Sequence, residues 1–142
     1  MIQLENYESQ CQPEQPKIVS QDKGSSCKHT AENDERCAVR HYQIDGNVIN
    51  DSTTQKCDFL LLNDTKCHAY FIELKGKAIA HAIGQVDNTI KVLAHMLGNY
   101  EIRPRIIYKS KTQSIKDSKV ISWQKRHHGR AKIKQGQLTE KI

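Results

Sequence analysis

A carboxylate and a lysine stand two positions apart at the end of an apolar segment. The run Cys67-His68-Ala69-Tyr70-Phe71-Ile72-Glu73-Leu74-Lys75 has the β-branched and aromatic content typical of a strand, and Gly76 follows it. Successive side chains of a strand point to opposite faces, so Glu73 and Lys75 share one face. Charged groups in such a strand are costly to bury without partners. Either Glu73 and Lys75 form an incidental ion pair, or they belong to a site.

A second carboxylate, Asp58, favours a site. It lies at the start of another short apolar run, Cys57 to Leu62, which ends at the polar turn Asn63 to Lys66. Two such runs joined by a short turn predict an antiparallel hairpin that brings Asp58 close to Glu73. Paired carboxylates on adjacent strands bind a hard divalent cation such as Mg²⁺, which prefers oxygen ligands. Lys75 would then orient an attacking water and stabilise charge on a phosphate.

The elements that must position these groups follow from the apolar pattern. Residues 38–44 predict a strand that ends at the turn Asp45-Gly46-Asn47, and residues 103–109 predict a further strand. After Gly76, apolar side chains recur at spacings of three and four, which predicts a helix of about twenty residues that ends near Gly98. The stripe consists of Ile79, Ala82, Ile83, Val86, Ile90, Leu93 and Leu97. The predicted order is therefore three strands, a helix and a strand.

The domain organisation follows from length and composition. A chain of 142 residues is long enough for one compact domain with its own core. Residues 1–36 are rich in Gln, Ser, Glu and Lys and carry Pro13 and Pro16, so we expect an N-terminal arm that is weakly structured or holds a short helix. Residues 37–142 are expected to form a single domain with a basic C-terminal segment.

The charge balance points to polyanionic partners. The sequence has 22 Lys and Arg against 16 Asp and Glu, a formal net charge of +6. Five cations gather near Trp123, His127 and His128 and are candidates for nucleic-acid binding, namely Lys125, Arg126, Arg130, Lys132 and Lys134. A solvated basic tail explains the same pattern, and the sequence does not decide between the two.

The acidic pair, the lysine and the helix behind them resemble the PD-(D/E)XK nuclease superfamily, which includes restriction endonucleases and Holliday-junction resolvases. The resemblance implies an α/β fold with an αβββαβ core, in which helices flank a central mixed sheet. It implies that Asp58, Glu73 and the Leu74 carbonyl hold the metal and that Lys75 is the catalytic lysine. Several branches carry a glutamine on the following helix, and Gln85 matches that place.

Two departures from the superfamily pattern concern the site. Cys57 stands where the motif has a proline, and this change leaves Asp58 in place. The first helix of the superfamily often supplies a glutamate, for which Glu32 and Glu35 are candidates. Asp45, at the end of the first predicted strand, is another candidate accessory acid. The sequence does not choose among these three.

Cysteine usage and hydropathy bear on the compartment. Five cysteines are an odd number with no close C-x₂₋₄-C spacing, so we expect reduced thiols and neither a disulfide framework nor a zinc site. The first ten residues lack the pattern of a secretory signal, and the chain lacks about 18 consecutive apolar residues. We therefore expect a soluble, cytoplasmic protein without a membrane partner.

These features together predict a nuclease that hydrolyses DNA phosphodiester bonds with Mg²⁺, or with Mn²⁺ in its place. By analogy with other small nucleases, a homodimer is a possible partner state. The alternative is a nucleic-acid-binding or protein-interaction module that has the same fold and does not cleave. Cleavage assays on plasmid, single-stranded, branched and RNA substrates discriminate the two.

Overall fold

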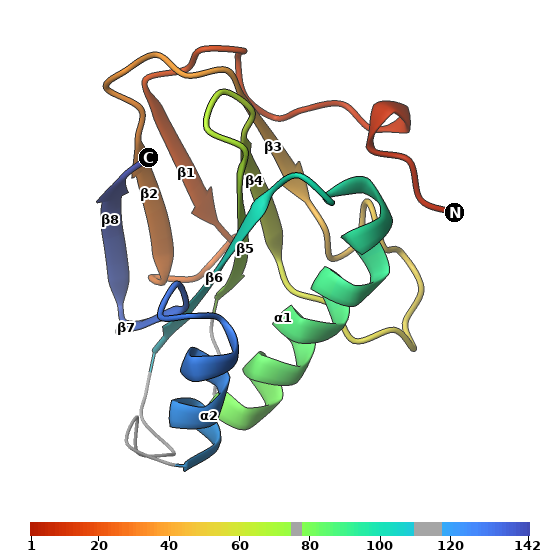
Figure 1. Cartoon of the computed structure of the whole chain (residues 1–142), viewed down its shortest axis with the longest axis vertical. Helices are drawn as coiled ribbons and strands as arrows, with labels where there is room; N and C mark the ends of the chain where they lie inside the picture. Colours follow the sequence, from red (N-terminus) through yellow and green to blue (C-terminus); the bar gives the residue numbers. More distant parts are fainter. Residues whose placement is uncertain (75–77, 110–117) are drawn as a thin grey trace.

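Two sheets and two α-helices make up residues 1–74, 78–109 and 118–142, the parts of the chain that this computed structural model describes. The larger sheet has the strand order β3 (Val39–Gln43), β4 (Phe59–Asn63), β5 (His68–Leu74), β6 (Glu101–Tyr108) and β7 (Lys132–Gln135). The smaller sheet has the order β1 (Lys17–Gln21), β2 (Lys28–Glu32) and β8 (Gln137–Lys141). The helices are α1 (Ile79–Leu93) and α2 (Ser118–Arg126) (Figure 1). The predicted α/β class is confirmed.

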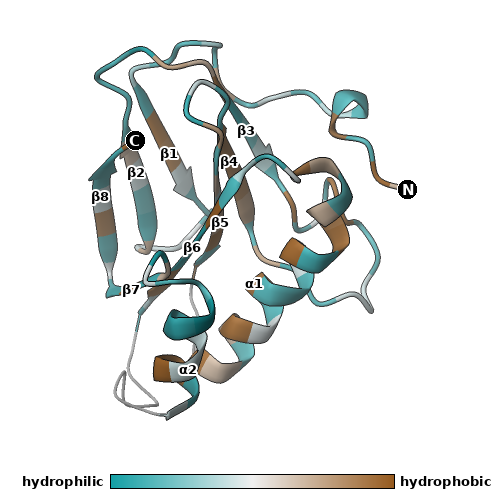
Figure 2. Ribbon diagram, in the orientation of Figure 1, coloured by the Kyte–Doolittle hydropathy of each residue, from teal (hydrophilic) through white to brown (hydrophobic). Residues whose placement is uncertain are grey.

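The central part of the larger sheet has the predicted order of elements. Strands β3, β4 and β5 form an antiparallel meander, α1 follows, and β6 then pairs with β5 in parallel. Every residue of β4 is buried, as is β5 beyond its first residue, because other elements cover both faces of the sheet. In Figure 2 the ribbon is coloured as hydrophobic along much of these two strands and at intervals along α1.

The helices cover one face of the larger sheet. The stripe on α1 is largely buried, and the helix continues as a short 3₁₀ helix, η2 (Ala94–Met96). On α2, Val120 and the fully buried Trp123 face the core, and the Trp123 Nε1 donates a hydrogen bond of 2.9 Å to Asp87 on α1. Among the described residues, neither helix combines the length and the apolar character that a membrane span requires.

The smaller sheet covers the opposite face, where the resemblance predicted helices. Its apolar residues Ile18, Ala31 and Ile142 join a second core with Tyr70 and Ile72 of β5. The αβββαβ core also predicts a first helix ahead of β3. That helix is not found: residues 1–38, all described, hold a 3₁₀ helix, η1 (Leu4–Asn6), and the β1–β2 hairpin.

The segment 1–36 is therefore more ordered than a weakly structured arm. Strands β1 and β2 pair along five residues, and β2 also pairs in parallel with β8. The sequence did not indicate these strands because much of what they bury is polar, including Ser20, His29 and Thr30. These polar groups find partners that lie far along the chain. The Ser20 Oγ lies 2.8 Å from the Nε2 of His41 on β3.

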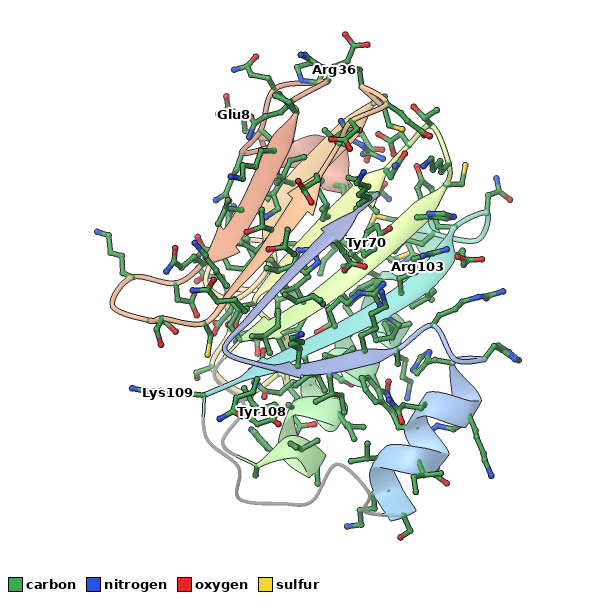
Figure 3. The ribbon with its side chains drawn as sticks, turned by 90° about the vertical axis from the view of Figure 1, so that its left-hand side faces the viewer. Glu8, Arg36, Tyr70, Arg103, Tyr108 and Lys109 are labelled. Atoms are coloured by element: carbon green, nitrogen blue, oxygen red, sulfur yellow. The ribbon has the colours of Figure 1, made fainter. Side chains whose placement is uncertain are left out.

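A buried ion pair joins the two sheets. The Arg105 guanidinium on β6 donates to both Glu140 oxygens on β8, at 2.6 and 3.1 Å, and the His29 Nε2 lies 2.7 Å from Glu140. Arg105 is only 1% exposed. The centre of the Tyr70 ring lies 5.2 Å from the Arg105 guanidinium carbon and 5.9 Å from that of Arg103. Tyr70 and Arg103 are labelled in Figure 3. Charge pairing and ring contacts thus supplement a small apolar interface.

Candidate active site

Asp58 and Glu73 come together at one end of the β4–β5 hairpin. The register pairs Phe59 with Ile72, and its continuation by one residue places Asp58 opposite Glu73. The Asp58 N–H donates to the Ile72 carbonyl at 3.1 Å, which extends the ladder to this position. Each carboxyl group is close enough to the other to shift its pKa. The pairing results directly from strand alternation and hairpin register.

The backbone fixes one of these carboxyl groups. The Leu74 N–H donates to the Asp58 Oδ2 at 2.8 Å. The Leu74 side chain is buried in the core beneath the smaller sheet, while Glu73 takes the opposite face. The structure therefore gives Leu74 a backbone role beside Asp58 through its N–H, and the use of its carbonyl as a metal ligand remains a prediction.

Burial raises the pKa of both carboxyl groups. Glu73 is 5% exposed, and its Oε1 has no hydrogen-bond partner among the described residues. Burial, and then the charge and hydrogen bond of Asp58, raise the pKa of Glu73 to about 10. Burial also raises the pKa of Asp58 to about 6, against the hydrogen bond from Leu74. At neutral pH the pair holds a proton that a bound cation would displace.

This donor set fits a hard divalent cation. Mg²⁺ commonly takes one or two protein carboxylates and completes its shell with waters and substrate oxygens. Asp58 and Glu73 supply two carboxylates, and the Glu73 Oε1 is an acceptor without a hydrogen-bond partner in the described part of the chain. Within the described ranges, no group of three or more His, Cys, Asp or Glu side chains is arranged to hold a metal. Lys75, the predicted catalytic lysine, lies outside the described residues.

Two further acidic residues contribute to the electrostatic field at Asp58 and Glu73. Asp22 follows β1 and Asp45 follows β3, and the negative charge of each raises the pKa values of both Asp58 and Glu73. Asp45 was among the predicted accessory acids. Asp22 was missed, because it lies in the segment that the sequence assigned to an arm, and its only signal was its place after the alternating run of β1.

The glutamates proposed for the missing first helix lie elsewhere. Glu32 ends β2. The Glu35 carboxylate lies 2.8 Å from the Lys66 Nζ at the β4–β5 turn, which is the end of the hairpin remote from Glu73. Neither appears among the charges that shift the pKa values of Asp58 and Glu73.

Gln85 lies in a polar cavity beside the start of β4. Its Nε2 donates to the Lys56 carbonyl at 3.1 Å, and both residues line a cavity of about 410 Å³ together with Asp45 and His81. The Lys56 side chain is 12% exposed, and its Nζ lies 3.9 Å from the Asp45 Oδ1. The loop before Asp58 and the first turns of α1 therefore line an open polar cavity, and among the described residues its lining includes Asp45 but neither Asp58 nor Glu73.

The predicted basic segment does not form one surface around the carboxylates. Lys125 and Arg126 end α2, and the Arg126 guanidinium lies 3.0 Å from the Asp87 carboxylate. Lys132 lies 3.3 Å from Glu140, on the face that carries the smaller sheet.

The remaining two cations of the segment lie at opposite ends of the larger sheet. Arg130 pairs with Glu101 at 3.3 Å, and Glu101 is in register with His68 at the start of β5. Lys134 is in register with Ile107, which in turn pairs with Leu74. Lys134 alone therefore shares a ladder row with the acidic end of β5.

Comparisons of the chain with protein-family models, with curated proteins and with solved structures found no match.

Proposed function

We propose that this protein is a Mg²⁺-dependent nuclease that hydrolyses phosphodiester bonds in DNA at the Asp58–Glu73 pair. The observation that carries the proposal is the buried Glu73 carboxyl group, which lies against Asp58 and has one oxygen with no hydrogen-bond partner within residues 1–74, 78–109 and 118–142. Two acids placed where burial and mutual repulsion disfavour their charged forms are costly to the fold. Strongly perturbed carboxyl groups of this kind are characteristic of functional sites.

The order of elements supports the same proposal. Asp58 directly precedes β4 and Glu73 lies on β5, the second and third strands of an antiparallel meander that is followed by α1 and the parallel strand β6. This βββαβ order agrees with the later part of the PD-(D/E)XK core that the sequence resembles. The proposal therefore stands on the chemistry of the pair and on the topology that positions it.

Each residue has a distinct part in the proposed reaction. A bound Mg²⁺ would polarise a phosphoryl oxygen and lower the pKa of a water. Asp58 and Glu73 would hold the ion, and the Leu74 N–H keeps the Asp58 carboxyl group oriented. Gln85, anchored on the Lys56 carbonyl, would position a water or a phosphate oxygen in the polar cavity. Lys75 would donate to the attacking water and to the phosphate as negative charge develops.

Three single substitutions test the proposal. Asp58→Asn, Glu73→Gln and Lys75→Ala should each lower metal-dependent cleavage at least about a hundredfold, because all three residues act on one step, and their combination should add little. Cleavage is measured on plasmid, single-stranded, branched and RNA substrates with Mg²⁺ or Mn²⁺. Glu35→Gln and Lys66→Ala make the same chemical changes in an exposed pair and should leave the rate unchanged. A folded Asp58→Asn or Glu73→Gln variant that cleaves at the wild-type rate contradicts the proposal.

A further inference from the structure

A second groove lies between the two helices and is separate from the cavity at Gln85. It has a volume of about 370 Å³ and is lined by Ile83 of α1 and by Ser118, Lys119, Ser122 and Arg126 of α2. Its lining therefore combines two cations, two hydroxyl groups and one apolar side chain. Among the residues that the structure describes, its lining includes no carboxylate, whereas Asp45 lines the cavity at Gln85.

The geometry of α2 orders these groups in a line. Ser118, Ser122 and Arg126 recur every four residues, so they lie along one stripe of the helix with about 6 Å between neighbours. Val120 and Trp123 occupy the other side and are buried. Asp87 accepts hydrogen bonds from Trp123 and Arg126, so the same carboxylate that fixes α2 against α1 also orients the Arg126 guanidinium.

The groove lies toward the same end of the molecule as the acidic pair. Glu73 is six positions before Ile79, the first residue of α1, and Ile83 lies one turn into that helix. Figure 1 shows the start of α1 and the start of α2 together at the end of the molecule where β5 and β6 finish. A strand held in the groove would therefore run at the end of the molecule toward which the carboxylates lie.

We propose that this groove binds the sugar-phosphate backbone of the DNA strand that enters the site, an inference that rests on the proposed nuclease function. Arg, Lys and Ser side chains are the usual protein partners of DNA phosphate oxygens. The spaced hydroxyl and guanidinium groups of α2 contact successive phosphates, and Ile83 packs against a deoxyribose. Because these contacts are with the backbone, they fix the position of the strand without selecting a base sequence.

The test compares two pairs of substitutions that remove the same charge. Lys119→Ala with Arg126→Gln removes both groove cations, whereas Lys17→Ala with Lys141→Ala removes two exposed cations on the smaller sheet, outside the groove. Binding of fluorescein-labelled single-stranded and duplex DNA is followed by anisotropy in EDTA, over a range of salt. The groove pair should weaken binding about tenfold and flatten the plot of log affinity against log salt by about 0.7 to 0.9 per lost phosphate contact. The control pair should change both quantities much less.

A single substitution tests the groove without disturbing Asp87. Ser122→Glu places a negative charge on the stripe and should weaken DNA binding more than Ser122→Ala does, while circular dichroism and thermal unfolding stay as in the wild type. Three results would each overturn the proposal that the groove binds DNA. They are equal losses of affinity in the groove pair and the control pair, unchanged binding by Ser122→Glu, and no DNA binding by the wild type.

Binding and cleavage distinguish this inference from the nuclease proposal. If the groove variants bind weakly but cleave normally at saturating substrate, both proposals stand. If the groove variants bind DNA weakly and the wild type does not cleave any substrate, the groove proposal is supported and the nuclease proposal fails. If the wild type cuts through Asp58 and Glu73 but the groove variants bind DNA normally, only the groove fails.

Discussion

Glu73 is the residue whose environment makes the sharpest prediction about metal binding. Glu73→Gln keeps the shape of the side chain and removes an ionisable group whose charged form burial and Asp58 both disfavour. At pH 8 without metal, we expect this variant to unfold at a temperature equal to or above that of the wild type. Mg²⁺ at ten times its dissociation constant should stabilise the wild type by about 1.4 kcal/mol, a rise in Tm of about 5 °C. The variant should gain almost nothing.

Thermal denaturation with and without MgCl₂ checks this expectation. Glu35→Gln serves as the control, since it makes the same chemical change at an exposed ion pair and should respond to Mg²⁺ as the wild type does. Equal stabilisation of wild type and Glu73→Gln by Mg²⁺ would exclude Glu73 as a ligand.

His41 predicts how stability responds to acid. Burial, and then the charge of His29, lower the pKa of His41 from 6.5 to about 4. Between these values the unfolded chain binds a proton that the folded chain does not, so this contribution is present above pH 6.5 and is lost as the pH falls toward 4. The loss amounts to about 3 kcal/mol over the window.

Urea denaturation at several pH values, compared with His41→Gln, isolates this contribution. The glutamine keeps a polar group near the Ser20 hydroxyl and does not titrate, so its stability should fall less between pH 7 and 4. Parallel pH profiles of the two proteins would show that His41 does not carry the effect.

At the scale of elements, Glu140 determines how firmly β8 holds to the rest of the fold. Glu140→Ala leaves the Arg105 guanidinium, which is 1% exposed, without its carboxylate. Loss of one partner from a buried ion pair costs about 3 to 5 kcal/mol, because the remaining charge stays out of water. Urea unfolding should show a loss of this size, and amide exchange in β2 and β8 should accelerate.

The neighbouring Lys141 provides the matched control on the same strand. Lys141 pairs with Asp34 at 3.3 Å, but its side chain is 77% exposed. Lys141→Ala should therefore change the free energy of unfolding by no more than about 0.5 kcal/mol. If Glu140→Ala costs no more than this control, the Arg105–Glu140 pair does not stabilise the sheet contact.

The elements differ in how well the sequence predicted them, and the reason is where each finds its partners. Strands β3 to β6 and helix α1 carry their own apolar periodicity, and all five were predicted in order. Strand β1 has only Ile18 as a buried apolar residue and also buries Ser20, whose partner His41 lies on another sheet. Such a strand has no local signal strong enough to separate it from a polar arm.

For the molecule as a whole, the site was predictable only where neighbouring strands form it. Asp58 and Glu73 could be paired from hairpin register alone. Asp22 joins their electrostatic surroundings from a different sheet, and the groove on α2 depends on how that helix packs against α1. These relations depend on the tertiary arrangement, which spacing in the sequence does not encode.

The basic segment shows that residues close in sequence can also be separated by the tertiary arrangement. The five cations from Lys125 to Lys134 are close in sequence, but α2 ends before His128 and Gly129, which take positive φ values of 55° and 75° and turn the chain toward β7. That turn divides the cations among a helix end and two ends of the larger sheet. The five cations are therefore close in sequence but do not form one charged surface.

The parallel pairing of β2 with β8 has a consequence for synthesis and folding. The contact between His29 and Glu140 spans 111 positions, so closing the smaller sheet costs far more chain entropy than forming the β4–β5 hairpin. While the chain is being made, the β1–β2 hairpin leaves the ribosome long before β8 and exposes an unpaired edge of β2 in the interval. Such edges invite pairing between chains. We therefore expect nascent chains that stop short of residue 137 to be more prone to self-association than the 142-residue chain.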